Sequence, residues 1–256
     1  MHDGKTGPLK PLKWYKDLAD RQGRMAGEAF LLEGPRAVRQ VLSSDPGAIL
    51  EILSTKEQPG EYSSYPQRLL TASQLKSVSS TQTPQDIIAV VRLPLETYSD
   101  ALPPVTGGSI LLLEDVQDPG NVGTLIRTAA AFGYSGTILT DKCADPFSPK
   151  CLQASAGTVL SLWIRRTPHY IELIRELKNK GFSLAAMDLR GREDMDVLQS
   201  SGRLLLALGN EAAGLSQPLL ELADHRLKIP VAADKAESLN VASCGAICMY
   251  LGRPRA

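Results

Sequence analysis

The sequence predicts an α/β protein whose C-terminal part contains a parallel sheet. Short apolar runs at residues 109–113 and 203–208 have the composition of strands buried on both faces. Segments with helical spacing alternate with such runs, which favours repeated strand–helix units. Polar, glycine-containing loops follow several of the runs, where a parallel sheet places a binding site.

Composition sets the class of protein. The chain has 256 residues, of which 43% are hydrophobic and 22% charged, as in globular domains. No apolar run approaches the roughly 18 residues of a membrane helix, and no apolar segment follows the N-terminus as in a signal peptide. We therefore expect a cytoplasmic protein without membrane contact. The zero net charge argues against a generally basic nucleic-acid binder and leaves room for a local basic face.

The four cysteines form no CxxC pair. We expect reduced, mostly buried thiols and no metal site.

The first part of the chain predicts a small α/β domain. Strands are expected at residues 29–33, 48–54, 69–71 and 86–92, with helices at 34–43 and after Ser73, a candidate cap. A basic first helix carries Lys13 and Arg24. Prolines and glycines between residues 94 and 108 indicate a linker, so we place the domains at 1–105 and 106–256.

The second part continues the alternation. Strands are expected at residues 109–113, 137–140, 162–164, 182–186, 203–208 and 225–229, and a polar loop near 191–192. Helices are expected from Val122 to an end at Gly133, and at 150–160, 170–180 and 238–250. Arg127 is the one charge in a small, apolar helix. It is either a partnered arginine at a packed interface or a functional group.

Two late loops contain candidate functional residues. Gly209 permits close backbone approach to a ligand, and Glu211 can accept from a ribose or an amine. Ser238 is placed to cap the last helix or to act in a site. Asn240, just inside that helix, has no propensity reason to be there. Neither a GxGxxG run nor a Walker phosphate loop is present, and the histidines form no metal or nucleophile pattern.

Three stretches together resemble the SpoU (TrmH-like) family of RNA ribose methyltransferases in the SPOUT superfamily. They are DPGNVG at 118–123 with Arg127, LGNE at 208–211 with Gly214, and Ile229-Pro230 with SLNV at 238–241. Their order and spacing agree across residues 109–250. Upstream, residues 30–34 resemble the small ribosomal-protein-like domain that binds substrate in these enzymes.

The resemblance implies S-adenosylmethionine-dependent methylation of a ribose 2′-hydroxyl in structured RNA, with rRNA favoured over tRNA. It also implies a C-terminal trefoil knot that forms the cofactor pocket, and a homodimer with each active site near the subunit interface. The implied catalytic residues are Asn121, Arg127, Glu211, Ser238 and Asn240. The implied cofactor residues are Leu208, Gly209, Asn210, Gly214, Ile229, Pro230 and Leu239. RNA contacts are expected at Lys13, Arg24, Glu33 and Arg165. The loop at 231–237 departs from the family pattern, because it lacks the expected glycine and carries Asp234 and Lys235.

The resemblance makes Arg127 the residue that activates the hydroxyl. A neutral arginine at pH 7 costs at least ~7.5 kcal/mol, so we favour a charged Arg127 that binds an RNA phosphate and stabilises the developing alkoxide. One alternative reading is an RNA-binding or ribosome-assembly protein that retains the fold without catalysis. Another is a methyltransferase that modifies a base.

Overall fold

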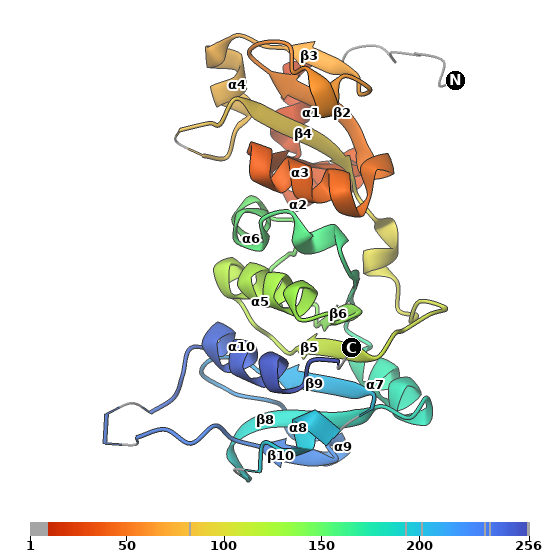
Figure 1. Ribbon diagram of the computed structural model, residues 1–256, viewed down its shortest axis with the longest axis vertical. Helices are drawn as coiled ribbons and strands as arrows, with labels where there is room; N and C mark the ends of the chain where they lie inside the picture. The colour runs from red at the N-terminus through yellow and green to blue at the C-terminus, as the bar shows by residue number, and fades with distance from the viewer. Residues whose placement is uncertain are drawn as a thin grey trace. The chain divides into compact units, whose positions relative to one another are not determined.

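The computed structural model contains two compact units, each built around its own sheet (Figure 1). It describes residues 10–81, 83–192, 194–200, 202–232, 234–235 and 237–254. The larger unit comprises Leu95–Pro146 and Ser161–Ala256, and the smaller one comprises Met1–Pro94 and Phe147–Leu160.

The sheet of the larger unit has six parallel strands in the order β10-β8-β9-β5-β6-β7. The strands are β5 (Ser109–Leu113), β6 (Gly136–Leu139), β7 (Trp163–Arg166), β8 (Ser183–Arg192), β9 (Leu204–Leu208) and β10 (His225–Leu227). The central strands β5 and β9 are buried along their whole length, in agreement with their apolar composition. The predicted α/β class with a parallel sheet is therefore confirmed.

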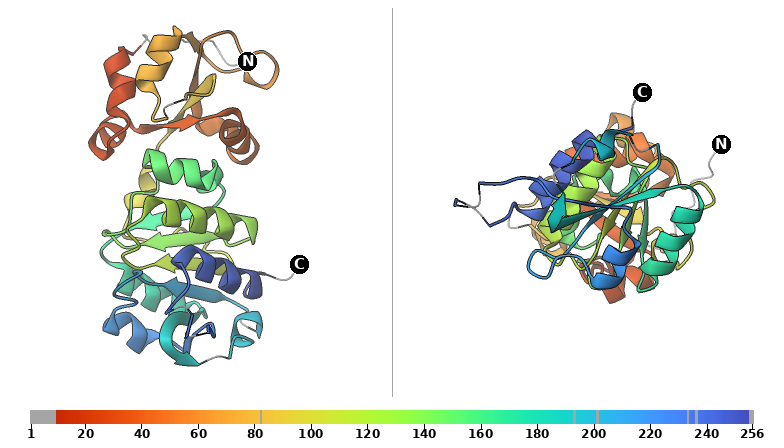
Figure 2. Two further views of the ribbon diagram at one scale, coloured as in Figure 1. Left: turned by 90° about the vertical axis from the view of Figure 1, so that its left-hand side faces the viewer. Right: turned by 90° about the horizontal axis from the view of Figure 1, so that it is seen from below.

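Helices cover both faces of this sheet. On one face, α7 (Tyr170–Asn179) and α9 (Gln217–Leu222) pack against Leu112, Leu184 and Leu205. On the other face, α5 (Pro119–Ala131) and α10 (Val241–Leu251) lie side by side (Figures 1 and 2). The unit also contains the one-turn segments η3 (Leu95–Tyr98) and α8 (Val197–Ser200).

The strand order positions the site. From β5 the chain moves outward through β6 to β7, whereas β8, β9 and β10 occupy the other half of the sheet. The direction of winding changes between the adjacent strands β5 and β9. In open parallel sheets ligands bind outside the carboxyl ends of strands at such a switch point. The loops that follow β5 and β9 carry two of the three motifs found in the sequence.

Local chemistry sets both ends of α5. The Asp118 carboxylate caps the helix by accepting from Asn121 N at 2.9 Å, and Pro119 is the first helical residue. The helix therefore begins three residues before the predicted Val122. Gly133 follows its C-terminal end with φ of 76°, which confirms the predicted stop.

Two predictions in this unit are wrong. The loop expected near 191–192 is strand, because β8 continues to Arg192 and the Arg192 carbonyl accepts from Lys228 N at 2.8 Å. The last helix begins at Val241 instead of residue 238. Its cap is Asn240, whose Oδ1 accepts from Ala242 N at 2.9 Å. Capping is the local reason for an asparagine here, and the sequence reading had missed it.

The smaller unit has a mixed four-stranded sheet in the order β1-β4-β2-β3. Its strands are β1 (Ala29–Glu33), β2 (Ile49–Ser54), β3 (Gln67–Leu69) and β4 (Ile87–Arg92), of which only β2 and β3 are paired in parallel. Its α-helices are α1 (Leu12–Asp17), α2 (Arg21–Gly27), α3 (Pro35–Ser44), α4 (Ala72–Val78) and α6 (Pro149–Ser155). Short 3-10 turns are η1 (Pro46–Ala48), η2 (Gly60–Tyr62) and η4 (Thr158–Leu160).

Three details of the smaller unit differ from expectation. The single basic helix is two helices, since Asp20 starts α2 by accepting from Gly23 N at 2.7 Å. The cap of α4 is Thr71 instead of Ser73, in a capping box with Gln74. The predicted helix at 150–160 is α6 followed by η4.

The boundary between the two units is not at residue 105, where the sequence predicts it. It falls after Pro94, because the segment that follows packs on β7: Arg165 Nε donates to the Ala101 carbonyl at 2.7 Å. Residues 147–160 join the smaller unit, where the rings of Phe30 and Phe147 lie 5.0 Å apart.

Candidate active site

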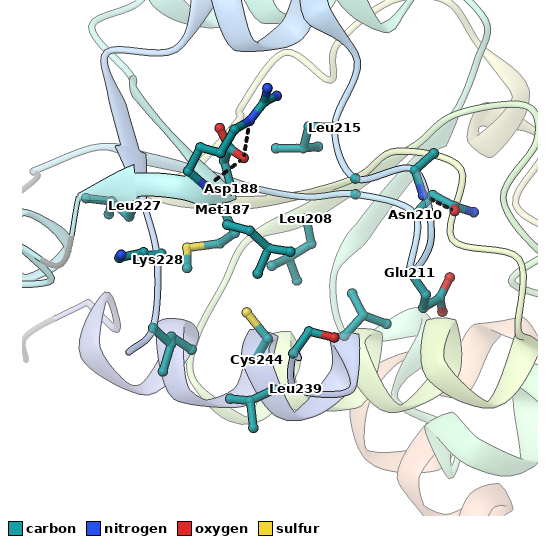
Figure 3. Close-up of a pocket in the computed structure, with 18 of the residues that line it drawn as sticks. Met187, Asp188, Leu208, Asn210, Glu211, Leu215, Leu227, Lys228, Leu239 and Cys244 are labelled. Carbon is teal, nitrogen blue, oxygen red and sulfur yellow. Dashed lines mark hydrogen bonds and ion pairs between the residues drawn. The ribbon is translucent and has the colours of Figure 1, made fainter. Parts of the chain in front are cut away.

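A cavity of about 380 Å³ opens beyond the carboxyl ends of β9 and β10 and beside the second half of β8 (Figure 3). Its wall includes residues 187–190 of β8, the loop 208–215 after β9, residues 227–229 and 231 after β10, and residues 238–239, 241 and 244. Figure 3 shows Met187, Leu208 and Cys244 pointing into the same space, with Glu211 at one end. Its size suits a small organic ligand.

The turn after β9 requires glycine at two places. A Cβ on Gly209 would lie 2.4 Å from the carbonyl carbon of Gly214. Gly214 has φ of 70°, a left-handed conformation that glycine adopts without strain. Asn210 closes the turn, because its Oδ1 accepts from Ala212 N and Ala213 N at 2.9 Å. These contacts hold backbone groups of the turn at the edge of the cavity.

A buried carboxylate fixes the same loop from the side of β5. Glu114, which is 4% exposed, accepts from Ser216 N at 2.7 Å, Ser216 Oγ at 2.6 Å and Tyr170 Oη at 2.5 Å. Burial, followed by the hydrogen bond to Glu114, raises the pKa of Tyr170 to about 12. The next residue, Asp115, accepts at its carbonyl from Asn210 Nδ2 at 2.9 Å. The end of β5 thus orients both ends of the cavity loop.

The three sequence motifs meet in a chain of side-chain hydrogen bonds. Asn121 Nδ2, in the first turn of α5, donates to Glu211 Oε1 at 2.8 Å. Asn240 Nδ2 donates to Asn121 Oδ1 at 3.2 Å. Residues 90 and 119 positions apart in the sequence are thereby joined at one place. The arrangement puts a carboxylate and two amides at the mouth of the cavity.

The remaining predicted residues divide into those on the cavity wall and those away from it. The wall includes the predicted residues Leu208, Gly209, Asn210, Glu211, Gly214, Ile229, Ser238 and Leu239. Pro230 and Asn240 do not line it, although Asn240 contacts Asn121. The loop at 231–237, whose sequence departs from the family pattern, is described only in part, since positions 233 and 236 lie outside the described residues.

Arg127 lies apart from this hydrogen-bond chain. It is six residues beyond Asn121, which places it ~9 Å further along the axis and on a different side of α5. Its side chain is exposed and does not line the cavity. Within the described ranges, no hydrogen bond or ion pair involves its guanidinium. The packed, partnered arginine considered from the sequence is therefore not observed.

Sequence reasoning missed the contribution of β8. Met187, Asp188 and Arg190 lie on the wall because the strand runs past the predicted end at residue 186. Burial acts to raise the pKa of Asp188. The hydrogen bonds from Arg226 and from Arg190 N, together with their charges, outweigh it and lower that pKa. The polar run from Asp188 to Arg192 was the available signal, but only its end near 191–192 was considered, and that end was assigned to a loop.

Cys244 was missed as well. It stands one turn into α10, and Figure 3 shows its sulfur directed into the cavity. A hydrogen bond from the Cys248 thiol lowers the pKa of Cys244 against the opposing effect of burial. All four cysteines are free thiols, as expected from the sequence. No group of three or more histidine, cysteine or acidic residues in the described part of the chain is arranged to hold a metal ion.

The four predicted RNA contacts have different surroundings. Lys13 is exposed. Arg24 is 2% exposed and donates to the carbonyls of Leu18 and Ala19 at 3.2 and 2.8 Å, so it ends α1 and is not open to RNA.

Arg165 and Glu33 are also engaged by the protein. Arg165 is 8% exposed and donates to the Ala101 carbonyl at 2.7 Å, and burial lowers its pKa. The Glu33 carboxylate accepts from the loop at 79–81. In a sequence, a charged residue that binds partners inside the protein cannot be told apart from a charged residue on a solvated face.

Comparison with known proteins identifies the family. The SpoU rRNA Methylase family profile matches residues 108–250, which contain all three motifs and the cavity. The chain belongs to the SpoU rRNA methylase family. The resemblance drawn from the motifs is thus confirmed.

Several known proteins resemble the chain over nearly its whole length. The 23S rRNA (guanosine(2553)-2'-O)-methyltransferase RlmP of Bacillus subtilis is 35% identical over 93% of this chain and 94% of its own. The AdoMet-bound rRNA methyltransferase from Sinorhizobium meliloti has a TM-score of 0.81 at 29% identity, over 97% of this chain and 95% of that chain. The SpoU methyltransferase AviRb from Streptomyces viridochromogenes, in complex with AdoMet, has a TM-score of 0.80 at 25% identity, over 94% of this chain and 96% of that chain. Among the described residues no helix is long and apolar enough to span a bilayer.

Proposed function

We propose that this chain transfers a methyl group from S-adenosylmethionine to a ribose 2′-hydroxyl of ribosomal RNA. The observation that carries the proposal is the Asn240–Asn121–Glu211 hydrogen-bond chain at the mouth of the cavity. It joins the three family motifs in one place. Related proteins that are named 23S rRNA 2'-O-methyltransferases support ribosomal RNA as the substrate and the cytoplasm as its location.

The residues of the cavity fit an adenosyl cofactor. Leu208, Leu215 and Leu227 are buried and give an apolar surface for a flat ring. The close contact of Gly209 with Gly214 leaves backbone groups of the turn exposed to a ligand. When bound, S-adenosylmethionine supplies an electrophilic methyl group on sulfur. The protein must then orient the hydroxyl oxygen toward that methyl and exclude misaligned approaches.

Glu211 and the two asparagines are assigned to the incoming ribose. The amide hydrogen bond fixes the Glu211 carboxylate, which accepts the hydrogen of the 2′-hydroxyl and orients its oxygen. The proton leaves to this carboxylate, to an RNA phosphate or to water. Ser238, on the cavity wall, donates or accepts at the ribose edge. Such positioning supplies several kcal/mol of rate enhancement.

Arg127 is assigned to an RNA phosphate as a permanently charged group. Its exposed position supports a role that begins when RNA or a second subunit arrives. The proposed homodimer is supported by the outer face of α10, where Ile247 and Tyr250 are 42% and 53% exposed. Tyr250 also stacks edge-on against Phe132 beyond the end of α5. A pair of subunits joined along α5 and α10 buries this apolar face.

The smaller unit is proposed to hold the RNA, with Lys13 as one exposed phosphate contact. The trefoil knot belongs to the same proposal. It is supported by Ile229 and Ser238, which line the same cavity from the two sides of the loop after β10, and by the packing of α10 beside α5.

Methyl transfer with labelled cofactor tests the function. The purified protein is incubated with S-adenosylmethionine carrying a labelled methyl group and with ribosomal RNA, while calorimetry measures cofactor binding. We expect binding and transfer by the wild type, and binding without transfer by Asn121→Ala. Cofactor binding without transfer to either ribosomal or transfer RNA by the wild type would indicate a non-catalytic protein.

A further inference from the structure

The smaller unit contains a second cavity, of about 310 Å³. It is bounded by the end of β1, the first turn of α3, residues 80–81 and 83–85, and α6. Its floor is apolar, since Leu32, Ala37 and Leu152 are 1%, 8% and 3% exposed. The volume lies at the lower end of the range for ligand pockets.

One wall of this cavity is fixed by Glu33. Its carboxylate accepts from Ser79 Oγ at 2.5 Å, Ser80 N at 2.6 Å, Ser80 Oγ at 2.5 Å and Thr81 Oγ1 at 3.3 Å. A carboxylate with this many donors does not need a cation from a ligand. Glu33 therefore builds the site without contacting what binds there.

Two glycines set the other walls. A Cβ on Gly34 would lie 2.4 Å from Gln85 Oε1, so the missing side chain lets the Gln85 amide lie over the start of α3. A Cβ on Gly157 would lie 2.4 Å from the Ala37 carbonyl, so the turn after α6 packs directly on α3. Both glycines have positive φ, of 92° and 85°. The cavity thus has a preformed shape.

Unused polar groups surround the apolar floor. Arg36, Gln85 and Gln153 line the cavity and are exposed. Within the described ranges their side chains make no hydrogen bond or ion pair. Each of the two amides can donate and accept hydrogen bonds along the edge of a planar ligand. A guanidinium can form hydrogen bonds with the same edge or stack on the face of the ligand. The floor offers an apolar surface for the face of that ligand.

We propose that this cavity binds one nucleobase of the RNA substrate, at a nucleotide other than the one that is methylated. The inference rests on the proposed function, because it takes RNA as the substrate. Proteins read RNA sequence through looped-out bases, which are hydrogen-bonded on their edges and stacked on side chains. Glutamine and arginine are the side chains that pair bidentately with adenine and guanine edges. A phosphate site is less suited to these residues, since the cavity offers one cation and two neutral amides.

The first test compares two arginines on one helix. Arg36 and Arg39 are both exposed on α3, but Arg39 pairs with Glu61 at 2.9 Å and does not line the cavity. We expect Arg36→Ala and Gln85→Ala to weaken RNA binding roughly tenfold. Arg39→Ala should bind RNA as the wild type does, and no variant should change cofactor affinity or melting temperature. Equal RNA affinities for Arg36→Ala, Gln85→Ala and Arg39→Ala would overturn the proposal.

The second test uses RNA fragments in which one nucleotide at a time is abasic. In the wild type, one abasic position outside the methylated nucleotide should weaken binding roughly tenfold, whereas in Gln85→Ala the same position should have little effect. Equal losses in both proteins at every position would overturn the proposal. Both readouts are RNA binding, so failure of the subsite is distinct from failure of methyl transfer.

Discussion

The side chain of Asn121 donates to Glu211 across 2.8 Å, and these residues come from the first turn of α5, which follows β5, and from the loop after β9. The strands are neighbours in the sheet, so the contact lies at its switch point. Asn240 extends the contact to the loop before α10. Because each of the three residues belongs to a different family motif, the hydrogen bonds explain why the motifs occur together in one chain.

Replacing Glu211 by glutamine tests the role of its charge. The amide keeps the shape and can still accept from Asn121, but it cannot take the hydroxyl proton. We expect kcat to fall on the order of 100-fold, while the Kd for S-adenosylmethionine changes little. Single-turnover kinetics and calorimetry measure the two quantities. Glu221→Gln on the exposed side of α9 is the matched control. Unchanged kcat in Glu211→Gln would remove this carboxylate from the mechanism.

Gly209→Ala should abolish tight cofactor binding. The new methyl group would meet the backbone of residues 214 and 215 within 2.4–2.6 Å, so the turn must open. Gly108→Ala in the same unit is the control, because its Cβ would have no neighbour within 4 Å. Calorimetry with S-adenosylmethionine compares the two variants. Equal affinities would show that the turn does not shape the cofactor site.

Substitution of Arg24 should change the stability of the protein, whereas substitution of Lys13 should change RNA binding. The Arg24 guanidinium is buried and donates to two carbonyls at the end of α1. Arg24→Ala is therefore expected to lower the free energy of unfolding by about 1–3 kcal/mol. The exposed Lys13→Ala should leave that free energy unchanged and weaken RNA binding modestly. Urea unfolding and RNA titration give the two values. A fully stable Arg24→Ala with weakened RNA binding would contradict the assignment.

Tyr170 should make the free energy of unfolding depend on pH in the alkaline range. Burial first, and then the hydrogen bond to Glu114, raise its folded-state pKa to about 12, above the ordinary value of 10.0. A raised pKa contributes stability that is complete below pH 10 and is lost as the pH rises toward 12. Unfolding free energies measured across this window should fall less steeply for Tyr170→Phe than for the wild type. Identical slopes would mean that Tyr170 titrates normally.

Much of the site could be predicted because its motifs are local. The turn at Gly209 and the helix stop at Gly133 depend on neighbouring residues, and a single sequence records both. The convergence of Asn121, Glu211 and Asn240 followed from the family resemblance and not from periodicity.

Other features depend on partners distant in the sequence, which residue patterns do not record. β8 continues past residue 186 because β10 pairs beside it and Arg226 binds Asp188. Arg24 looked like a surface cation, yet it folds back on carbonyls of the preceding turn. The RNA contact expected at Arg165 failed for the same reason, since the partner of its guanidinium is the carbonyl of Ala101.

The chemical position of the transferred methyl group tests the central claim most directly. RNA labelled by the wild type is hydrolysed in alkali, which cannot cleave beside a 2′-O-methylated ribose. We predict that the label is recovered in alkali-resistant dinucleotides, and that Asn121→Ala, with its cofactor bound, yields none. Label recovered in mononucleotides, with the methyl group on a base, would contradict the account.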